Sequence, residues 1–220
     1  MSSRGYHEGI WQAVPESSHG KDLAVRLDFA LQRLRAVEPA GGRSAISPPR
    51  VLDVGCGAGQ ITSEIVRAGF DVVGIDVAEE PLRRARSREP ALDVRLVAVD
   101  RAWPFDDASF DAVWAGETLE HVLDTAAWLS EVRRVLRSGG TLALSTPSLD
   151  RLRLLGLALS ASRFAERFDP CADHVRFYSR RTLAQLLGEF GFERIELRGG
   201  GGGLPWSRRT LLASAVRSRF

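Results

Sequence analysis

Hydrophobic residues follow two alternating patterns through the middle of the chain. Short apolar runs at 50–54, 71–76, 93–100, 110–115 and 141–147 have the length of buried strands. Between them, apolar residues recur at helical intervals over 61–69, 79–89 and 125–140, and two of these segments close with glycines, at 69 and at 139–140. Strands that alternate with helices of this length predict an α/β fold, in which a parallel sheet carries helices on both faces.

The two ends of the chain are less regular than this middle part. Residues 1–18 are polar and predict no regular element, whereas residues 21–37 predict an amphipathic helix that a loop at 38–49 ends. Residues 149–168 have helical spacing, and 179–192 predict a helix capped by Ser179 and stopped by Gly191. Strands at 192–200 and 210–217 complete the expected sheet as its sixth and seventh members.

Composition narrows the class of protein. The chain has 220 residues, 44% hydrophobic and 26% charged, which suits one folded domain and argues against global disorder. A formal net charge of +2 is too small to indicate a nucleic-acid partner. Cys56 and Cys171 show no metal-ligand or disulfide spacing, which fits a reducing cytoplasm. We expect no secretory signal and no membrane span, because no apolar stretch reaches ~18 residues.

The stretch VLDVGCGAGQ at 51–60 carries the first chemical signal. Glycines at 55, 57 and 59 let the backbone after the first strand approach a ligand closely. A dinucleotide enzyme uses a similar turn, but Gln60 stands where its fingerprint has a third glycine. Asp53, just before the turn, would repel a pyrophosphate and suits a ligand with a positively charged amine.

Acidic residues also follow the next two strands. Asp76 is placed to accept hydrogen bonds from ribose hydroxyls, and Asp100 to accept one from an adenine amine. Carboxyl ends of neighbouring parallel strands meet at one edge of the sheet, so Asp53, Asp76 and Asp100 describe a single ligand. That ligand has an ammonium group, a ribose and an adenine, but no phosphate, as S-adenosylmethionine (SAM) does.

The sequence resembles the class I SAM-dependent methyltransferases over roughly residues 48–200. The matching segments, in the family's order, are VLDVGCGAG, GIDVAEE, VRLVAVD, FDAVWAGETLEHV and RVLRSGGTLALSTP. ETLEHV and HVRFYSRRTLAQLLGEFGF look most like the small-molecule branch that includes the ubiquinone O-methyltransferases. The resemblance implies a three-layer Rossmann-like sandwich whose seven-stranded sheet is mostly parallel, with an antiparallel last strand.

The resemblance also implies roles for particular residues and segments. Residues 1–47 would form an N-terminal segment and helix that can act as a lid over cofactor or substrate, although a loose tail is the alternative. Residues 48–220 would form the SAM-binding domain, with a helical cap insert near 149–178. The expected cofactor-binding residues are Asp53, Gly55, Cys56, Gly57, Gly59, Asp76, Val77, Asp100, Arg101, Ala115 and Glu117.

Structural alternatives compete with these roles. Gly59 could simply begin a helix, Asp76 could cap the helix at 79–89, and Asp100 could cap a turn. His174, His121 and Glu117 are the candidate catalytic residues, and each could instead be a packed or capping side chain. Glu120 is an equally good candidate as a polar group of the pocket.

The expected reaction is in-line methyl transfer from SAM to a small-molecule acceptor, leaving S-adenosylhomocysteine. No metal is expected, because STPSLD offers only Asp150 as an acidic ligand near the fifth strand. The helical segment 149–168 carries leucines on one face and arginines beside them, which indicates either a pocket cover or contact with a membrane and a lipophilic acceptor. An NAD(P)-dependent oxidoreductase and a non-catalytic SAM-binding protein are the alternatives. The sequence leaves the acceptor and the oligomeric state open.

Overall fold

A computed structural model describes residues 3–13, 15, 22–37, 47–98, 102–149, 151–169, 173–201 and 209–219. Within these residues, seven strands form one sheet, in the order β3-β2-β1-β4-β5-β7-β6. The strands are β1 (Arg50–Val54), β2 (Asp71–Asp76), β3 (Asp93–Leu96), β4 (Phe110–Gly116), β5 (Leu136–Pro147), β6 (Phe192–Gly200) and β7 (Thr210–Arg217). The neighbours from β3 through β5 pair in parallel, and β7 is antiparallel to both β5 and β6. The predicted sheet is therefore confirmed.

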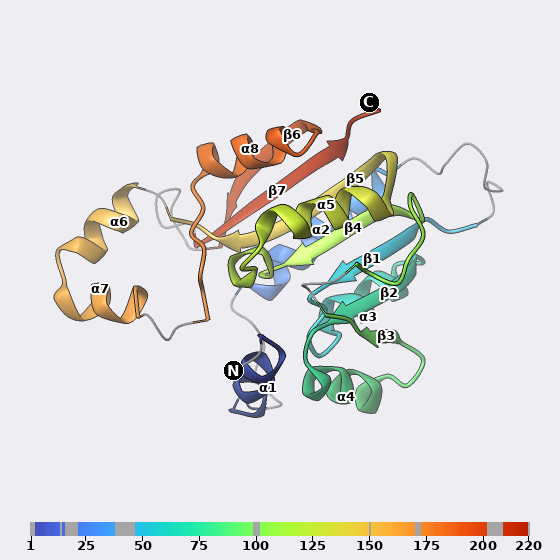
Figure 1. Cartoon of the computed structure of the whole chain (residues 1–220), viewed down its shortest axis with the longest axis horizontal. Helices are drawn as coiled ribbons and strands as arrows, with labels where there is room; N and C mark the ends of the chain where they lie inside the picture. The colour runs from blue at the N-terminus through green and yellow to red at the C-terminus, as the bar shows by residue number, and fades with distance from the viewer. Residues whose placement is uncertain are drawn as a thin grey trace.

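Helices cover both faces of this sheet (Figure 1). One face packs against α2 (Leu23–Arg35) and α3 (Gln60–Arg67), and the other packs against α5 (Thr125–Val135) and α8 (Arg180–Glu189). Successive strand residues point to opposite faces, so Val51 packs with Phe29 and Ile65 while Leu52 belongs to the cluster with Trp128. Strands buried on both sides explain the continuous apolar runs in the sequence. The remaining helices are α1 (Ser3–Ala13), α4 (Glu79–Arg88), η1 (Leu119–His121), α6 (Arg151–Ala158) and α7 (Ala161–Arg167).

Four boundaries differ from the sequence-based expectation. Residues 3–13 form a helix, although the polar pattern of 1–18 predicts none. Helix α5 ends at Val135, before the two glycines, because Leu136 already pairs with Phe110 and is fully buried. The segment 149–168 contains two helices, α6 and α7, and Ser160 stands at the N-cap position of the second without a side-chain capping bond. Strand β3 ends at Leu96, short of the expected residue 100.

Other predicted helix signals are confirmed. Ser179 accepts a hydrogen bond from the backbone N–H of Thr182 and forms a capping box with it. Gly191, which follows the C-cap residue Phe190 of α8, has a φ of +73°, the left-handed conformation that ends a helix. Gly69 has the same role after α3, with a φ of +94°.

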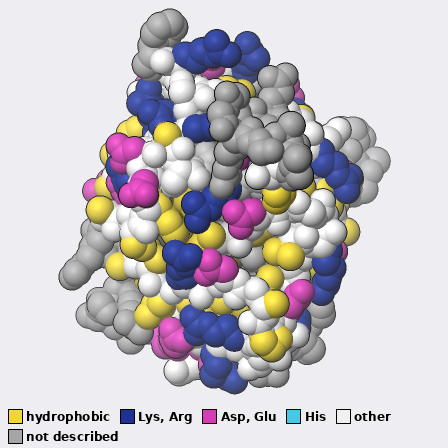
Figure 2. Space-filling view, turned by 90° about the vertical axis from the view of Figure 1, so that its right-hand side faces the viewer, with side chains coloured by type: hydrophobic (Ala, Val, Ile, Leu, Met, Phe, Trp, Pro, Cys, Tyr) yellow, Lys and Arg dark blue, Asp and Glu magenta, His cyan; other side chains and the backbone are white. Residues whose placement is uncertain are grey.

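Two features of the outer surface bear on binding partners: a projecting pair of helices, and a face on which basic and acidic side chains intermingle. Helices α6 and α7 stand away from the sheet at the left of Figure 1. The strands β1 and β4 point towards that same side, so Figure 2 views the molecule from the end where they begin. There, basic and acidic side chains intermingle, and the described side chains form no continuous basic band (Figure 2). None of the described helices has the length and apolar character that crossing a membrane requires.

Candidate active site

The turn between β1 and α3 lies at the carboxyl edge of the parallel strands. Gly55 and Gly57 have φ angles of +72° and +54°, which L-residues with a Cβ rarely adopt. A Cβ on Gly55 would lie 2.4 Å from the hydroxyl oxygen of Thr118, and one on Gly57 would lie 3.0 Å from the ring of Trp11. Both positions therefore need glycine for conformation and for space.

Asp53 lies beneath this turn and is almost fully buried, with 2% of its surface exposed. Its Oδ2 accepts a hydrogen bond of 2.7 Å from the hydroxyl of Thr62 on α3. Burial raises the pKa of Asp53 to about 7, the bond from Thr62 opposes the rise, and the nearby charge of Asp76 adds to it. A positively charged ligand group beside Asp53 would therefore stabilise its ionised form.

Asp76 joins the end of β2 to the glycine turn. Its Oδ2 accepts from the backbone N–H of Gly57 at 2.9 Å, and its Oδ1 accepts from the N–H of Ala78 at 3.0 Å. Asp76 does not cap α4, because the carboxylate of Glu8 does so instead. The two oxygens of Glu8 accept from the N–H groups of Glu79 and Glu80 at 2.8 and 3.1 Å.

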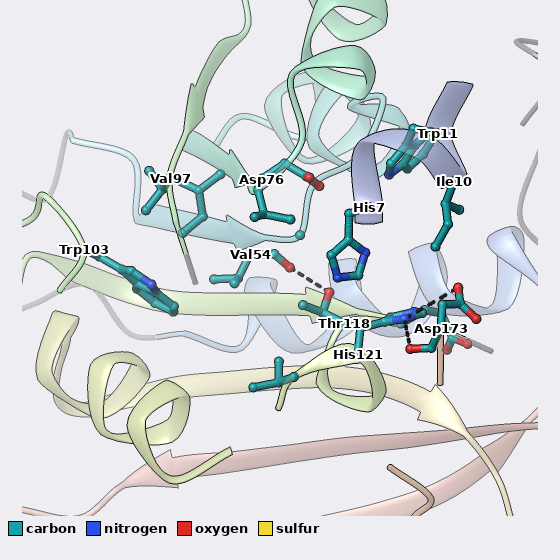
Figure 3. A pocket seen from close by; sticks show the side chains of 15 residues that line it. His7, Ile10, Trp11, Val54, Asp76, Val97, Trp103, Thr118, His121 and Asp173 are labelled. Carbon is teal, nitrogen blue, oxygen red and sulfur yellow. Dashed lines mark hydrogen bonds and ion pairs between the residues drawn. The ribbon is translucent and has the colours of Figure 1, made fainter. Parts of the chain in front are cut away.

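Two adjoining cavities open around these residues. The first, of about 220 Å³, runs from Asp76 and Val77 past apolar side chains to His121 and Asp173. The second, of about 280 Å³, lies over Asp53, the glycine turn and Arg26. Gly55, Trp11 and Glu117 border both. Figure 3 shows His7 reaching from α1 into the space between Asp76 and His121, so α1 forms part of the first cavity's wall.

Glu117 and Thr118 follow β4 at the junction of the two cavities. Glu117 has a φ of +52°, and its Oε1 accepts from the hydroxyl of Ser145 at 2.8 Å. Burial raises the pKa of the Glu117 carboxyl group. Thr118 donates its hydroxyl to the carbonyl of Val54 at 2.9 Å, which ties the end of β4 to the end of β1.

His121 and His174 come together at the far end of the first cavity. Their ring centroids lie 4.8 Å apart, although 174 belongs to a distant part of the sequence. The Nδ1 atom of His121 lies 2.9 Å from the carbonyl oxygen of Asp173. Burial lowers the pKa of His121 to about 4 and also lowers that of His174. Both imidazoles are therefore neutral at pH 7 and can accept a proton or an electrophile.

The structure brings together most of the residues that the sequence predicts. Cys56 borders the second cavity and is buried, and burial raises the pKa of its thiol well above the ordinary value. Ala115 and Gly59 differ, because neither lines either cavity. Ala115 is fully buried in the core cluster, and Gly59 is the N-cap residue of α3, close to Ala85 on α4. Asp100 and Arg101 lie outside the described residues, as do Asp150 and Cys171, so their predicted roles stay predictions.

The N-terminal part of the chain contributes Arg26, which sequence reasoning missed, and Trp11, which belongs to the segment expected as a lid. Arg26 on α2 is buried, with 7% exposure, and borders the second cavity beside Asp53 and Glu117. A lone arginine on the apolar face of a predicted helix was the available signal. Trp11 lies against Gly57, and its carbonyl accepts from Arg84 on α4 at 2.9 Å. No local pattern in residues 1–18 indicates that contact.

Known proteins are similar to this chain in fold and in sequence. A family profile described as a methyltransferase domain matches residues 22–197. The ubiquinone biosynthesis O-methyltransferase of Xanthomonas axonopodis pv. citri is 36% identical over 205 residues, covering 89% of this chain and 80% of that protein. The chain is a class I SAM-dependent methyltransferase. Its cofactor is therefore SAM, and its acceptor is a small molecule.

Solved methyltransferase structures share the fold at lower identity. The CurJ carbon methyltransferase superposes with a TM-score of 0.69 and 18% identity, over 90% of this chain and 56% of that longer one. A phosphoethanolamine N-methyltransferase from Haemonchus contortus, in complex with S-adenosylhomocysteine, superposes with a TM-score of 0.63 at 15% identity. That match covers 100% of this chain and 61% of the other. In the present chain, the buried Asp53 and Asp76 and the glycine turn fit SAM.

Proposed function

We propose that this methyltransferase methylates a hydroxyl group on a small, lipophilic aromatic acceptor. The observation that carries the proposal is the neutral His121 imidazole on the wall of the first cavity, where apolar side chains such as Val97 and Trp103 make up much of the lining. A carbonyl oxygen can only accept, so the contact with Asp173 makes Nδ1 the donor and leaves a lone pair on Nε2. The name of the Xanthomonas relative, a ubiquinone biosynthesis O-methyltransferase, supports oxygen rather than nitrogen as the methylated atom.

We assign the two cavities to different parts of the reaction. The methionine end of the cofactor would lie in the second cavity, where Arg26 faces its carboxylate and Asp53 its ammonium group. Asp76 would accept from the ribose hydroxyls, and Val77 would lie beside the adenine. The acceptor would enter the remainder of the first cavity, between Glu117 and His121.

Methyl transfer then needs alignment and removal of one proton. The acceptor oxygen forms a bond to the methyl carbon while the carbon–sulfur bond breaks. The electron pair of the carbon–sulfur bond stays on sulfur and neutralises the sulfonium. The hydroxyl proton leaves the acceptor oxygen, and the candidate groups to assist are His121 and Glu117, which border the first cavity, and His174, which packs against His121. An alcohol or phenol mostly keeps its proton at pH 7, so an activating group has a clear role.

We propose that α1 is a cover for the cofactor and part of the acceptor site. His7, Ile10 and Trp11 border the first cavity, and Glu8 attaches the helix to α4 through two hydrogen bonds. Because this attachment uses backbone N–H groups of α4, the helix can be held in place without a large apolar interface. The lid role expected for residues 1–47 is in this way assigned to 3–13.

We also propose that α6 and α7 contact a membrane surface that supplies the lipophilic acceptor. On these two projecting helices and the turn between them, four apolar side chains expose between 41% and 81% of their surface: Leu154, Leu155, Leu159 and Phe164. Arginines in the same segment suit anionic lipid headgroups. The cytoplasmic location remains a prediction, based on the two thiols.

A paired substrate series tests the proposed reaction. We would first titrate the protein with S-adenosylhomocysteine by calorimetry, and then supply methyl-labelled SAM with aromatic acceptors. The series contains catechols, with and without an isoprenoid tail, and matched compounds in which an amine replaces each hydroxyl. We expect label on oxygen and faster transfer to tailed catechols. Transfer to the amines alone would contradict the proposal, even with normal cofactor binding.

A further inference from the structure

Helix α1 carries a histidine, His7, that reaches into the first cavity. His7, Ile10 and Trp11 are spaced three and four positions apart, so they lie on one face of the helix, and all three border that cavity. Gly9 and Gln12, on the other side of α1, are exposed. Of the three side chains that meet the cavity, only His7 can both donate and accept a hydrogen bond.

His7 lies between two groups to which different parts of the reaction are assigned. Figure 3 shows its ring between Asp76 and His121. The ring centroids of His7 and His121 lie 5.9 Å apart, with the ring planes at 81° to one another. Burial raises the pKa of Asp76, while backbone N–H bonds and then the charge of His7 lower it. His7 is therefore a neighbour both of the acid assigned to the ribose and of the imidazole assigned to the acceptor.

Contacts with α4 hold His7 in this position. The next residue, Glu8, accepts from two backbone N–H groups at the start of α4, at 2.8 and 3.1 Å. One turn further along α1, the carbonyl of Trp11 accepts from Arg84 at 2.9 Å, and the Arg84 side chain is only 9% exposed. Because both attachment points lie within four residues of His7, they set where its side chain enters the cavity.

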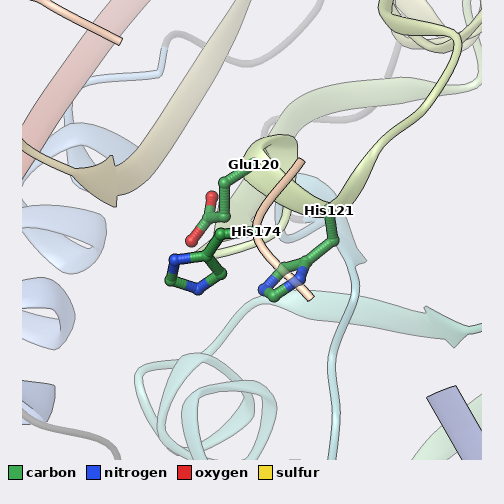
Figure 4. A group of neighbouring side chains, drawn as sticks. All are labelled: Glu120, His121 and His174. Carbon is green, nitrogen blue, oxygen red and sulfur yellow. The ribbon is translucent and has the colours of Figure 1, made fainter. Parts of the chain in front are cut away.

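His121 and His7 differ in what orients their rings. The Nδ1 atom of His121 lies 2.9 Å from the carbonyl oxygen of Asp173, and His174 packs against His121 with ring centroids 4.8 Å apart (Figure 4). These contacts fix the tautomer and the direction of the His121 ring. His7 makes ring contacts with Tyr6 and His121, but neither of its nitrogens has a hydrogen-bond partner among the residues that the structure describes. The His7 imidazole can therefore present a donor or an acceptor to a ligand.

We propose that His7 is a specificity-determining residue, which hydrogen-bonds a second polar group of the acceptor next to the hydroxyl that is methylated. The inference rests on the proposed function, from which it takes the acceptor space beside His121. Two imidazoles that contact one another in one cavity can each bond one of two adjacent oxygen atoms. An acceptor with a single hydroxyl leaves His7 covered and without a partner, and sites built to bond a substrate hydroxyl reject analogues that lack it.

Two substitutions separate this role from simple packing. His7→Phe keeps an aromatic ring against His121 but removes both nitrogens, so a residue that only packs would tolerate it. His7→Gln removes the ring but keeps one donor and one acceptor. If hydrogen bonding to the acceptor is the role of His7, the glutamine variant should retain more of the acceptor preference than the phenylalanine variant does.

Acceptor binding can be measured without methyl transfer. We would saturate the protein with S-adenosylhomocysteine and titrate it by calorimetry with 4-pentylcatechol and with 4-pentylphenol, which lacks one hydroxyl. We expect the parent to bind the catechol tenfold or more tightly than the phenol. His7→Phe should bind the two compounds with similar affinity, and His7→Gln should keep part of the preference. Equal binding of both compounds by the parent, no binding of either, or a preference that His7→Phe leaves intact would overturn the proposal.

Kinetics and a control variant complete the test. With labelled SAM, His7→Phe should raise the KM for the catechol tenfold or more with little change in kcat, because the lost bond serves binding. Gln12→Ala, on the exposed side of the same helix, should behave as the parent does. Weaker S-adenosylhomocysteine binding in His7→Phe, with the catechol preference intact, would assign His7 to the cofactor instead. Transfer to amines alone would contradict the proposed function, whereas the binding preference reports on His7 separately.

Discussion

The Oδ2 atom of Asp76 lies 2.9 Å from the backbone nitrogen of Gly57, so the acid at the end of β2 holds the turn that follows β1. This bond connects two strands at the point where the sequence predicts one shared ligand. Asp76 therefore has a structural role in the turn in addition to the contact proposed with the ribose.

Replacing Asp76 should remove both contributions. We expect Asp76→Ala to lower the affinity for S-adenosylhomocysteine by 10- to 100-fold, because hydrogen bonds to a charged group are each worth about 1.5–3 kcal/mol. Calorimetry on the purified variant measures the loss. Asp71→Ala is the matched control, because Asp71 is the exposed acid at the other end of the same strand. Equal loss in both variants would contradict a local role for Asp76.

Adding one methyl group to the glycine turn should block the cofactor site. Gly57→Ala places a Cβ 3.0 Å from the Trp11 ring on a backbone with φ of +54°. The backbone conformation alone costs on the order of 1 kcal/mol. Gly69→Ala is the control, since Gly69 also has a positive φ but open space around it. We expect similar thermal destabilisation in the two variants, with weaker S-adenosylhomocysteine binding only in Gly57→Ala.

Asp53 makes folding stability depend on pH in a defined direction. Its pKa rises on folding from 3.8 to about 7, so the folded protein holds this proton more tightly than the unfolded chain does. The contribution of Asp53 to stability is therefore greatest below 3.8 and is lost as the pH rises to about 7. Asp53→Asn abolishes this dependence while keeping an acceptor for Thr62.

Urea unfolding without cofactor measures the effect of Asp53. We expect Asp53→Asn to be about 1–3 kcal/mol more stable than the parent at pH 8, with a smaller difference between the two proteins at pH 5. Asp71→Asn, on the surface, should show neither difference. The same Asp53→Asn protein should bind S-adenosylhomocysteine more weakly at pH 8, because the buried charge is then absent. Stabilisation that is identical at both pH values would contradict the assignment.

The attachment of α1 predicts a remote effect on cofactor binding. Glu8→Ala removes both hydrogen bonds to the start of α4, and loss of such a cap costs about 1 kcal/mol. We expect the affinity for S-adenosylhomocysteine to fall about three- to tenfold, with the rest of the fold unchanged by circular dichroism. Glu64→Ala on α3, which removes an exposed ion pair with Arg67, should leave the affinity as it was.

The exposed leucines of α6 and the segment after it predict lipid binding. The double change of Leu155 and Leu159 to serine should lower partitioning to phosphatidylglycerol vesicles tenfold or more, because each buried leucine is worth about 1.5 kcal/mol or more. Flotation at low and high salt measures it. Leu123→Ser is the control, since Leu123 is also exposed, at 67%, but lies on another part of the surface. No flotation of the parent under either condition would end the membrane proposal.

The sequence predicts the order of strands and helices well, because the spacing of apolar residues within each segment is enough to identify it as a strand or a helix. The glycine turn and Asp76 are visible for the same reason. Element boundaries that depend on tertiary contacts cannot be predicted in this way. Helix α5 ends at Val135 because Leu136 pairs with Phe110, and nothing local distinguishes that position from the glycines that follow.

The candidate site was harder to predict where it depends on distant residues. Glu8 caps a helix more than seventy positions away, a contact that no spacing rule anticipates. Three polar residues that are separate candidates in the sequence come together only in the fold, where a carboxylate oxygen of Glu120 and ring nitrogens of His121 and His174 lie within 4.8 Å of one another. The burial of Arg26 was not predicted, because a single charged residue in an amphipathic helix pattern most often faces solvent.

The position of the N-terminal helix has a practical consequence for handling the protein. Helix α1 contributes His7 to the lining of the cavity that Asp76 also borders. A purification tag fused directly ahead of this helix would emerge beside that cavity and compete for its opening. The other terminus lies on the far side of the molecule, beyond β7 (Figure 1). A tag placed there leaves the opening clear, so titrations and kinetics made with the two fusions should not be treated as interchangeable.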